Sequence, residues 1–406
     1  MRILHTADWH LGKKLDHAER TDEHQDFLNW LIDKLNEENI DILIVAGDIF
    51  DTGSPSNTAL QQYYSFLSNV RNTCCKEVII IGGNHDSMST LDAPKELLRF
   101  FKVHVVGGVP EVFTDQIIPI KDLAGNLELV VCAVPFLRDR DIRLSISGET
   151  TEERLERITG GIRDHYHGFI EHIADYKSQG IPVIATGHLF AAGASTSDSE
   201  KEIHVGNLGQ VGADHFPVQF DYVALGHIHR PQLVNQKAHI RYSGSPIPLS
   251  FSENEDKKQV LILNFDEDKM LAIETHEVPC NRKLIRIKGP LDRVKSKILL
   301  LEDPQLKYPT WVEVQIETDA HIPYLEEQLN LLKATKPFID KLCFKQTILK
   351  PYQNLDQLAD EALALNDLDP KAVFIKRCEA EYGDQDFADL VESFDEVIEQ
   401  MTQIER

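Results

Sequence analysis

At 406 residues the chain exceeds one ordinary domain, and its 42% hydrophobic residues are enough to build a substantial core. Its six cysteines show no C-x-x-C spacing, which favours reduced thiols and argues against a disulfide framework or a zinc ribbon. The sequence runs straight into a strand-like segment and contains no stretch of about 18 uninterrupted apolar residues. We therefore expect a cytoplasmic protein without a membrane span.

The net charge of −24 is distributed unevenly along the chain. Residues 1–280 carry −17, residues 281–351 carry +4, and residues 352–406 carry −11. A basic middle segment beside an acidic tail favours one surface that meets phosphates and another that meets protein, although ordinary solvated surface explains the same charges equally well. We predict three parts with these boundaries.

The first part reads as repeated strand–helix–strand units. Apolar runs at 42–46 and 78–81 alternate with helical patterns near 21–35, 60–70 and 91–101, and Thr21 is placed to cap the first helix. The later sequence predicts a helix from about 151 to 178 and an irregular, glycine-containing excursion at 191–218. This alternation predicts a layered α/β domain with functional side chains at the carboxyl ends of strands.

The second part shows three strand-like runs, near 283–288, 311–317 and 341–348, that alternate with two helical patterns, near 290–302 and 321–335, and so predict a compact α/β module. Beyond Pro351, amphipathic helices are predicted near 354–365, 370–381 and 385–404. They either pack on the module or dock on a partner. The apolar anchors expected in such docking are Phe374, Phe387, Leu390 and Phe394.

Residues that bind metals follow five strand-like apolar runs. An acid and an imidazole at i and i+2 leave a strand end on the same side, so both can face one ion. Two carboxylates, one amide oxygen and four imidazoles suit Mn²⁺, Fe²⁺ or Zn²⁺ better than Ca²⁺, and seven ligands suit two ions about 3.5–4 Å apart that share a carboxylate. The candidate ligands are Asp8, His10, Asp48, Asn84, His188, His227 and His229.

Taken in order, Asp-x-His, Gly-Asp, Gly-Asn-His-Asp, Gly-His and Gly-His-x-His resemble the calcineurin-type metallophosphoesterase signature across residues 1–229. The segments 1–12, 45–55 and 244–251 are similar to Mre-type DNA double-strand-break repair nucleases. The resemblance implies an α/β fold: a β-sandwich flanked by helices, followed by a small α/β capping domain and a helical tail. Residues 1–280 would then be the nuclease domain, 281–351 a capping and DNA-binding domain, and 352–406 a tail that docks an ATPase partner.

The resemblance also assigns roles to the site residues. It implies that Asp8, His10, Asp48 and His229 surround one metal, and that Asp48, Asn84, His188 and His227 surround the other. His85 becomes the catalytic imidazole, since its side chain diverges from that of Asn84, and Asp51 matches the acid that pairs with it in related phosphatases. Asp51 can instead simply form a turn. Arg138 and Arg140 are candidates to contact DNA phosphates, with pairing to Asp139 and Asp141 as the alternative.

The implied function is a metal-dependent DNA nuclease: a 3′–5′ exonuclease on duplexes and an endonuclease on single strands and hairpins, acting in DNA repair, recombination and replication. It would use two divalent ions, Mn²⁺ or Mg²⁺, and form a homodimer through the helices near 60–70 and 91–101, within a heterotetramer that includes an SMC-like coiled-coil ATPase. The sequence has no G-x-x-x-x-G-K-S/T loop, so ATP would bind to that partner. The alternatives are a phosphodiesterase or phosphatase for a small substrate and a non-catalytic scaffold.

Overall fold

The structure, a computed structural model, divides into two compact units, one made of Met1–Ile316 and Pro323–Gln346 and the other of Glu317–Ile322 and Thr347–Arg406. All the predicted site residues belong to the first unit. The residues that the structure describes are 1–122, 124–142, 150–191, 194–200, 211–266, 269–319 and 321–348, with Lys371, Phe374, Ile375, Cys378, Leu390, Val391, Ser393 and Phe394.

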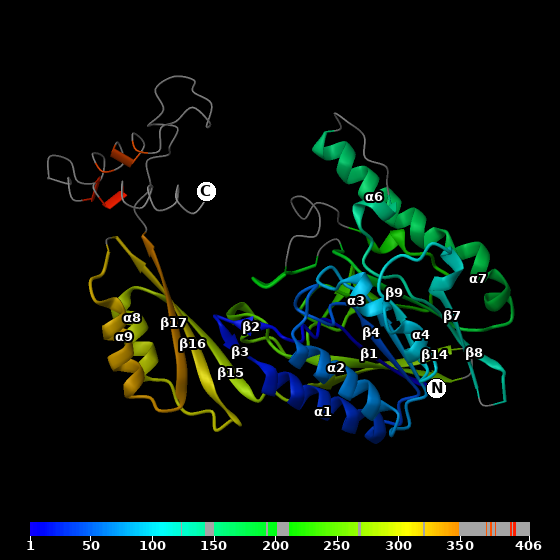
Figure 1. Cartoon of the computed structure of the whole chain (residues 1–406), viewed down its shortest axis with the longest axis horizontal. Helices are drawn as coiled ribbons and strands as arrows, with labels where there is room; N and C mark the ends of the chain where they lie inside the picture. The colour runs from blue at the N-terminus through cyan, green and yellow to red at the C-terminus, as the bar shows by residue number, and fades with distance from the viewer. Residues whose placement is uncertain are drawn as a thin grey trace. The chain divides into compact units, whose positions relative to one another are not determined.

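Two six-stranded sheets dominate the first unit (Figure 1). In each sheet four neighbouring strands run parallel, and antiparallel strands complete it at the edges. The order of the first sheet is β14 (Lys269–Glu277), β13 (Gln259–Asp266), β1 (Arg2–Thr6), β4 (Ile42–Ala46), β5 (Glu77–Ile81) and β6 (Val103–Val106). The order of the second is β11 (Gln232–Val234), β12 (Lys237–Tyr242), β10 (Tyr222–Gly226), β9 (Val183–His188), β8 (Leu127–Cys132) and β7 (Ile117–Lys121).

The two sheets pack face to face through apolar side chains. Ile44 and Ile79 of the first sheet and Val131 and Ile184 of the second belong to one core cluster, and each of them is fully buried. The central strands β4, β5, β9 and β10 are buried along their whole length. Strands covered on both faces read as continuous apolar runs, which is why the sequence pattern predicts these strands.

Helices cover the outer face of each sheet. On the first sheet, α1 (Thr21–Glu37), α2 (Asn57–Val70), α3 (Met88–Asp92) and α4 (Lys95–Arg99) bury their apolar sides in one cluster with β1, β4 and β5. On the second, α6 (Thr151–His167) and α7 (Phe169–Ser178) pack against β8, β9 and β10. The layers are therefore helix, sheet, sheet, helix. Short elements complete this part: β2 (Lys14–Leu15), β3 (Ala18–Glu19), α5 (Asp139–Ile142), η1 (Phe113–Gln116), η3 (Ala213–His215) and η4 (Phe251–Glu253).

Two helix predictions need correction. Thr21 is the first residue of α1 and not its cap, because the cap position belongs to Arg20, which provides no side-chain cap. Arg20 is buried instead, and its guanidinium donates to the Glu23 carboxylate and to the Pro248 carbonyl. The single helix predicted near 151–178 is divided at Gly168, where α6 ends and α7 begins.

The elements after residue 280 follow the predicted order. A three-stranded sheet consists of β15 (Arg282–Gly289), β16 (Tyr308–Thr318) and β17 (Ile339–Ile348), joined by α8 (Leu291–Leu299) and α9 (Leu325–Ala334). This sheet contacts α1 through ion pairs: Arg282 Nε donates to Glu23 Oε1 over 2.8 Å, and Lys307 Nζ lies 2.6 Å from Asp26 Oδ1. Two carboxylates one turn apart on α1 therefore anchor the strands that follow Pro279.

The predicted α/β fold class is confirmed: a helix-flanked β-sandwich followed by a smaller α/β sheet. All six cysteines are free. Of the helices that the structure describes, none has the length and apolar character needed to span a membrane. In the acidic tail, Phe374 and Phe394 stack with ring centroids 4.2 Å apart, whereas the helix predicted near 354–365 and the anchor Phe387 lie outside the described residues.

Candidate metal centre

The predicted ligands lie in loops that follow β1, β4, β5, β9 and β10, or at the end of the strand itself. Backbone hydrogen bonds join the first two of these loops, from Asp8 N to the Gly47 carbonyl and from His10 N to the Asp48 carbonyl, each over 3.0 Å. The pairing of β1 with β4 therefore continues past the ends of both strands. This arrangement brings Asp8, His10 and Asp48 into one place.

Four of the seven candidate ligands have positive φ angles. The φ values are 54° at Asp8, 46° at His10, 49° at Asp48 and 98° at His227. Such conformations disfavour residues with a Cβ and cost on the order of 1–3 kcal/mol each, so they persist only where the surrounding structure imposes them. Their concentration at these positions indicates that the backbone is bent to direct ligand atoms into the site.

Asp48 lies between two histidines. Its Oδ2 is 3.4 Å from His10 Nε2 and 3.3 Å from His188 Nε2, while its Oδ1 accepts a hydrogen bond of 2.9 Å from the backbone N–H of His85. Gly83 leaves space for this carboxylate, since a Cβ there would lie 2.1 Å from Asp48 Oδ1. Asp48 therefore lies between the His10 and His188 rings, with one carboxylate oxygen close to both.

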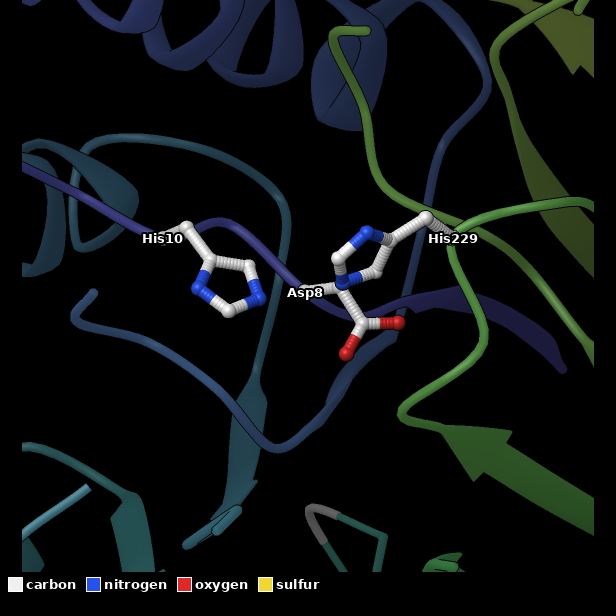
Figure 2. Close-up of side chains that lie close together, drawn as sticks. All are labelled: Asp8, His10 and His229. Carbon is white, nitrogen blue, oxygen red and sulfur yellow. The ribbon is translucent and has the colours of Figure 1, made fainter. Parts of the chain in front are cut away.

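Asp8, His10 and His229 form the first ligand group (Figure 2). One ligand atom of each lies within 4.8 Å of the others, and all three side chains are buried. Asp8 Oδ2 and His10 Nε2 have no hydrogen-bond partner in the described part of the chain. Because buried polar atoms are normally satisfied, these orphaned atoms fit a cation-binding role.

Asn84, His188 and His227 form the second group beside Asp48. Asn84 Oδ1 lies 3.0 Å from His188 Nε2 and 3.1 Å from His227 Nδ1. The other ring nitrogen of His188 donates to the Ala46 carbonyl over 2.9 Å, which leaves Nε2 as the free ligand atom. The structure therefore brings together all seven predicted ligands in two groups that share Asp48.

The surroundings raise the pKa of two candidate ligands. Burial would lower the pKa of His188, but the Asp48 carboxylate outweighs it and raises that pKa to about 9. Burial raises the pKa of Asp8 to about 7, although the charge of His188 opposes the shift. Metal binding must displace the protons on these two groups, so metal affinity rises with pH through this range.

His85 and Asp51 meet differently from the predicted pairing. His85 Nδ1 donates to the backbone carbonyl of Asp51 over 2.7 Å, whereas Asp51 Oδ1 lies 4.0 Å from that nitrogen. The carboxylate is nearer to Lys13 Nζ, at 3.1 Å, and to His10 Nδ1, at 3.3 Å. Burial would raise the pKa of Asp51, but the nearby His10 ring and Lys13 ammonium keep that pKa well below the usual range.

Asp86 clamps two ligand loops together. Its buried carboxylate accepts backbone hydrogen bonds from Ile49 and Phe50, which follow Asp48, and from Gly83, which precedes Asn84. Burial raises its pKa to about 6 despite these bonds. Asp86 therefore joins the backbone that follows Asp48 to the backbone that precedes Asn84.

The arginines proposed for DNA contact lie at and just before α5. The alternative of local pairing is present at Arg140, whose Nε is 3.6 Å from Asp141 Oδ1 while most of its side chain is exposed. Asp141 Oδ2 also accepts a hydrogen bond from the backbone N–H of Arg138, and Arg154 pairs with Asp139 over 2.6 Å.

Sequence reasoning missed the residues behind His229. His229 Nδ1 lies 2.6 Å from Ser199 Oγ, which in turn lies 2.5 Å from Oε1 of the buried Glu253. Lys258 Nζ pairs with the other Glu253 oxygen over 2.6 Å. The only signal was an acid two residues beyond Phe251, just after a segment that is similar to Mre-type nucleases.

The fold and this site define a phosphoesterase. Residues 1–231 match the family described as calcineurin-like phosphoesterase, and residues 280–382 match one described as type 5 capsule protein repressor C-terminal domain. The first match covers more than half of the chain, so the chain belongs to the calcineurin-like phosphoesterase family. The fold of this family implies that divalent metal ions bind at the site.

More narrowly, the chain belongs to the family of the SbcD subunit of the nuclease SbcCD, as its similarity to curated relatives shows. It is 38% identical to the SbcD subunit of Escherichia coli K12, over 83% of each chain. It is 33% identical to the protein of the same name from Bacillus subtilis, over 84% of each chain. For the Rhodobacter capsulatus protein the identity is 39%, over 62% of this chain and 64% of the relative.

Proposed function

We propose that this chain is the nuclease subunit of an SbcCD complex and hydrolyses phosphodiester bonds in DNA with two divalent metal ions. It is a phosphodiester-hydrolysing enzyme by family, and the relatives from Escherichia coli and Bacillus subtilis are named as nucleases. The observation that carries the two-metal proposal is Asp48 Oδ2, 3.4 Å from His10 Nε2 in one ligand group and 3.3 Å from His188 Nε2 in the other.

In this proposal Asp8, His10, Asp48 and His229 hold one ion, and Asp48, Asn84, His188 and His227 hold the other. When bound, the ions lower the pKa of a water molecule and neutralise phosphate charge. His85 keeps its Nδ1–H on the Asp51 carbonyl and its backbone N–H on Asp48, and we assign Nε2 to the proton transfer with the substrate. From there His85, when both ring nitrogens are protonated, donates the Nε2 proton to the leaving oxygen.

Asp51 acts in two ways. Its carbonyl holds the Nδ1–H and the ring orientation of His85, and its carboxylate orients His10 and holds the Lys13 ammonium beside the site. We therefore keep Asp51 in the catalytic group but assign its carboxylate to His10 in place of His85.

The donor set also bears on the choice of metal. Four imidazoles favour Mn²⁺ over Mg²⁺, which prefers oxygen ligands and retained water. We propose Mn²⁺, with Mg²⁺ as the weaker substitute, and ATP bound only by the SbcC partner. The proposed reactions are 3′–5′ exonuclease action on duplex ends and endonuclease action on single strands and hairpins in DNA repair, recombination and replication. We propose that the chain acts in the cytoplasm, because bacterial DNA lies there.

The decisive experiment offers the purified chain, with and without SbcC, either Mn²⁺ or Mg²⁺. The substrates are duplex, hairpin and circular single-stranded DNA, and a small chromogenic phosphodiester. We expect Mn²⁺-dependent cleavage of single-stranded DNA by the chain alone, and cleavage of duplex ends that needs SbcC and ATP. Turnover of the small ester without cleavage of DNA would support the alternative of a small-substrate phosphodiesterase.

We further propose that residues 1–280 form the nuclease domain, that the basic residues 281–351 form a capping domain that meets DNA, and that the acidic residues 352–406 dock SbcC. Arg138 and Arg140 are proposed to contact DNA phosphates. The charge contrast between the last two parts supports this division, because a phosphate backbone and a basic protein surface need opposite signs.

The chain is proposed to dimerise through α2 to α4 and the residues just after α4. Leu97 is 61% exposed and Phe100 is 86% exposed, whereas Leu67, a candidate contact from its place in the 60–70 pattern, is only 4% exposed and belongs to the core. Two copies of this chain would stand with two SbcC subunits in a heterotetramer. Large exposed apolar side chains on adjoining segments are typical of such interfaces.

Replacing Leu97 by glutamate should weaken self-association by roughly thirtyfold or more, since a buried, unpaired carboxylate costs about 2 kcal/mol or more. Light scattering and sedimentation should show a folded monomer. The matched control is Leu271→Glu, because Leu271 is 66% exposed on β14 and outside the proposed interface. A Leu97→Glu dimer as stable as the Leu271→Glu dimer would exclude this surface.

A further inference from the structure

Glu253 is a buried carboxylate with an unusually full set of hydrogen-bond donors. It ends η4 with 0% exposure and accepts from Lys258 Nζ at 2.6 Å and from the backbone N–H of Leu249 at 3.1 Å. The hydroxyl oxygens of Ser197, Ser199 and Ser250 lie 2.9, 2.5 and 3.1 Å from the same carboxylate. Buried ion pairs contribute little to stability relative to apolar packing, so this arrangement calls for another explanation.

The direction of the hydrogen bonds around Ser199 follows from proton counting. Its hydroxyl has one proton, and an ionised carboxylate 2.5 Å away can only accept, so Ser199 donates to Glu253. Ser199 Oγ must then accept from His229 Nδ1, at 2.6 Å. The proton of His229 is therefore fixed on Nδ1, and Nε2 is left with a free lone pair.

The backbone of His229 is held by the same surroundings. Its carbonyl accepts from Lys258 Nζ at 3.0 Å, and its N–H donates to Glu200 Oε1 at 2.9 Å. Ser199 and Glu200 are consecutive, so one short loop contacts both the ring and the backbone of this ligand. His188 differs, because its Nδ1 donates to a main-chain carbonyl that no side-chain substitution removes.

We propose that Glu253, acting through Ser199, is a positioning residue that fixes the tautomer and orientation of His229 for the first metal ion. The inference rests on the proposed two-metal function, with His229 as a ligand. A carboxylate behind a ligand histidine fixes the tautomer and the orientation of the ring and makes the ligand nitrogen more basic, and removal of such a partner typically lowers metal affinity roughly 10- to 100-fold.

The test is a titration of the metal-free, full-length protein with Mn²⁺. Calorimetry measures the two affinities, and electron paramagnetic resonance monitors the bound ion. Ser199→Ala removes the relay without leaving a buried charge unpaired, and Glu253→Gln removes the carboxylate. We expect both variants to bind one ion with wild-type affinity and the other about 10- to 100-fold more weakly. Ser199→Thr, which keeps a hydroxyl, should restore tight binding of both ions.

Glu23→Gln is the matched control for stability, since Glu23 is also a buried carboxylate in an ion pair but lies at the contact between α1 and β15. It should lower the melting temperature and leave both affinities unchanged. Two tight sites in Ser199→Ala and Glu253→Gln would overturn the role of Glu253. A wild-type chain that binds fewer than two ions would instead overturn the two-metal function itself.

Discussion

Replacement of His85 by alanine is expected to reduce DNA cleavage by about 10²- to 10⁴-fold while two metal ions remain bound. The backbone and the ring of this residue make different contacts. Its backbone N–H, which alanine retains, donates to Asp48 Oδ1 over 2.9 Å, whereas its ring, which alanine lacks, contacts the Asp51 carbonyl and is the part that we propose transfers a proton. Cleavage of single-stranded DNA gives the rate, and anomalous scattering at the metal absorption edge gives the occupancy.

His188→Ala is the comparison for that experiment. Its ring lies within 3.3 Å of Asp48 Oδ2 and 3.0 Å of Asn84 Oδ1, so it should lose metal as well as activity. If His85→Ala also lost an ion, the division between a ligand set and a separate catalytic imidazole would be wrong.

Removal of residues 352–406 is expected to abolish co-purification with SbcC and ATP-dependent processing of duplex ends. Mn²⁺-dependent cleavage of single-stranded DNA should remain largely intact, because every proposed metal ligand precedes residue 230. The net charge of −11 would steer a basic partner surface, and apolar side chains would supply most of the affinity. Pull-down of tagged SbcC and end-resection assays measure the two effects.

A point variant separates docking from loss of the whole tail. Leu390 is 41% exposed in the tail, and Leu331 is 73% exposed on α9. Leu390→Glu should weaken the pull-down, and Leu331→Glu should leave it unchanged. Retention of SbcC by the truncated chain at undiminished yield would place the docking element elsewhere.

The fold was predictable because its central strands are buried on both faces and carry ligand-type residues where they end. Asp48 illustrates the point, since it follows five consecutive apolar residues and a glycine, and sits where the loops after β1 and β5 meet. Leu67 illustrates the limit. A helical period identifies an apolar side of α2 but does not say whether that side meets the core or another chain, and the structure buries it.

The parts of the site that could not be predicted depend on contacts between distant residues. Ser199 and Glu253 are 54 positions apart and meet only because both pack behind His229. At Asp51 the difficulty is local: one residue offers a carbonyl and a carboxylate, and the sequence does not say which of them faces His85. Loop conformation decides both cases.

The positive φ angles at the candidate ligands lower the stability of the folded chain. These ligands are Asp8, His10, Asp48 and His227. Glycine at any of these positions would relieve backbone strain of about 1–2 kcal/mol, and at Asp8 or Asp48 it would also remove a buried carboxylate. A library randomised at these codons and selected only for protease resistance in chelator should therefore accumulate glycine and asparagine. The selected variants would fold well but would have lost the ability to hold two ions. Directed evolution of a more stable variant must therefore also select for catalytic activity.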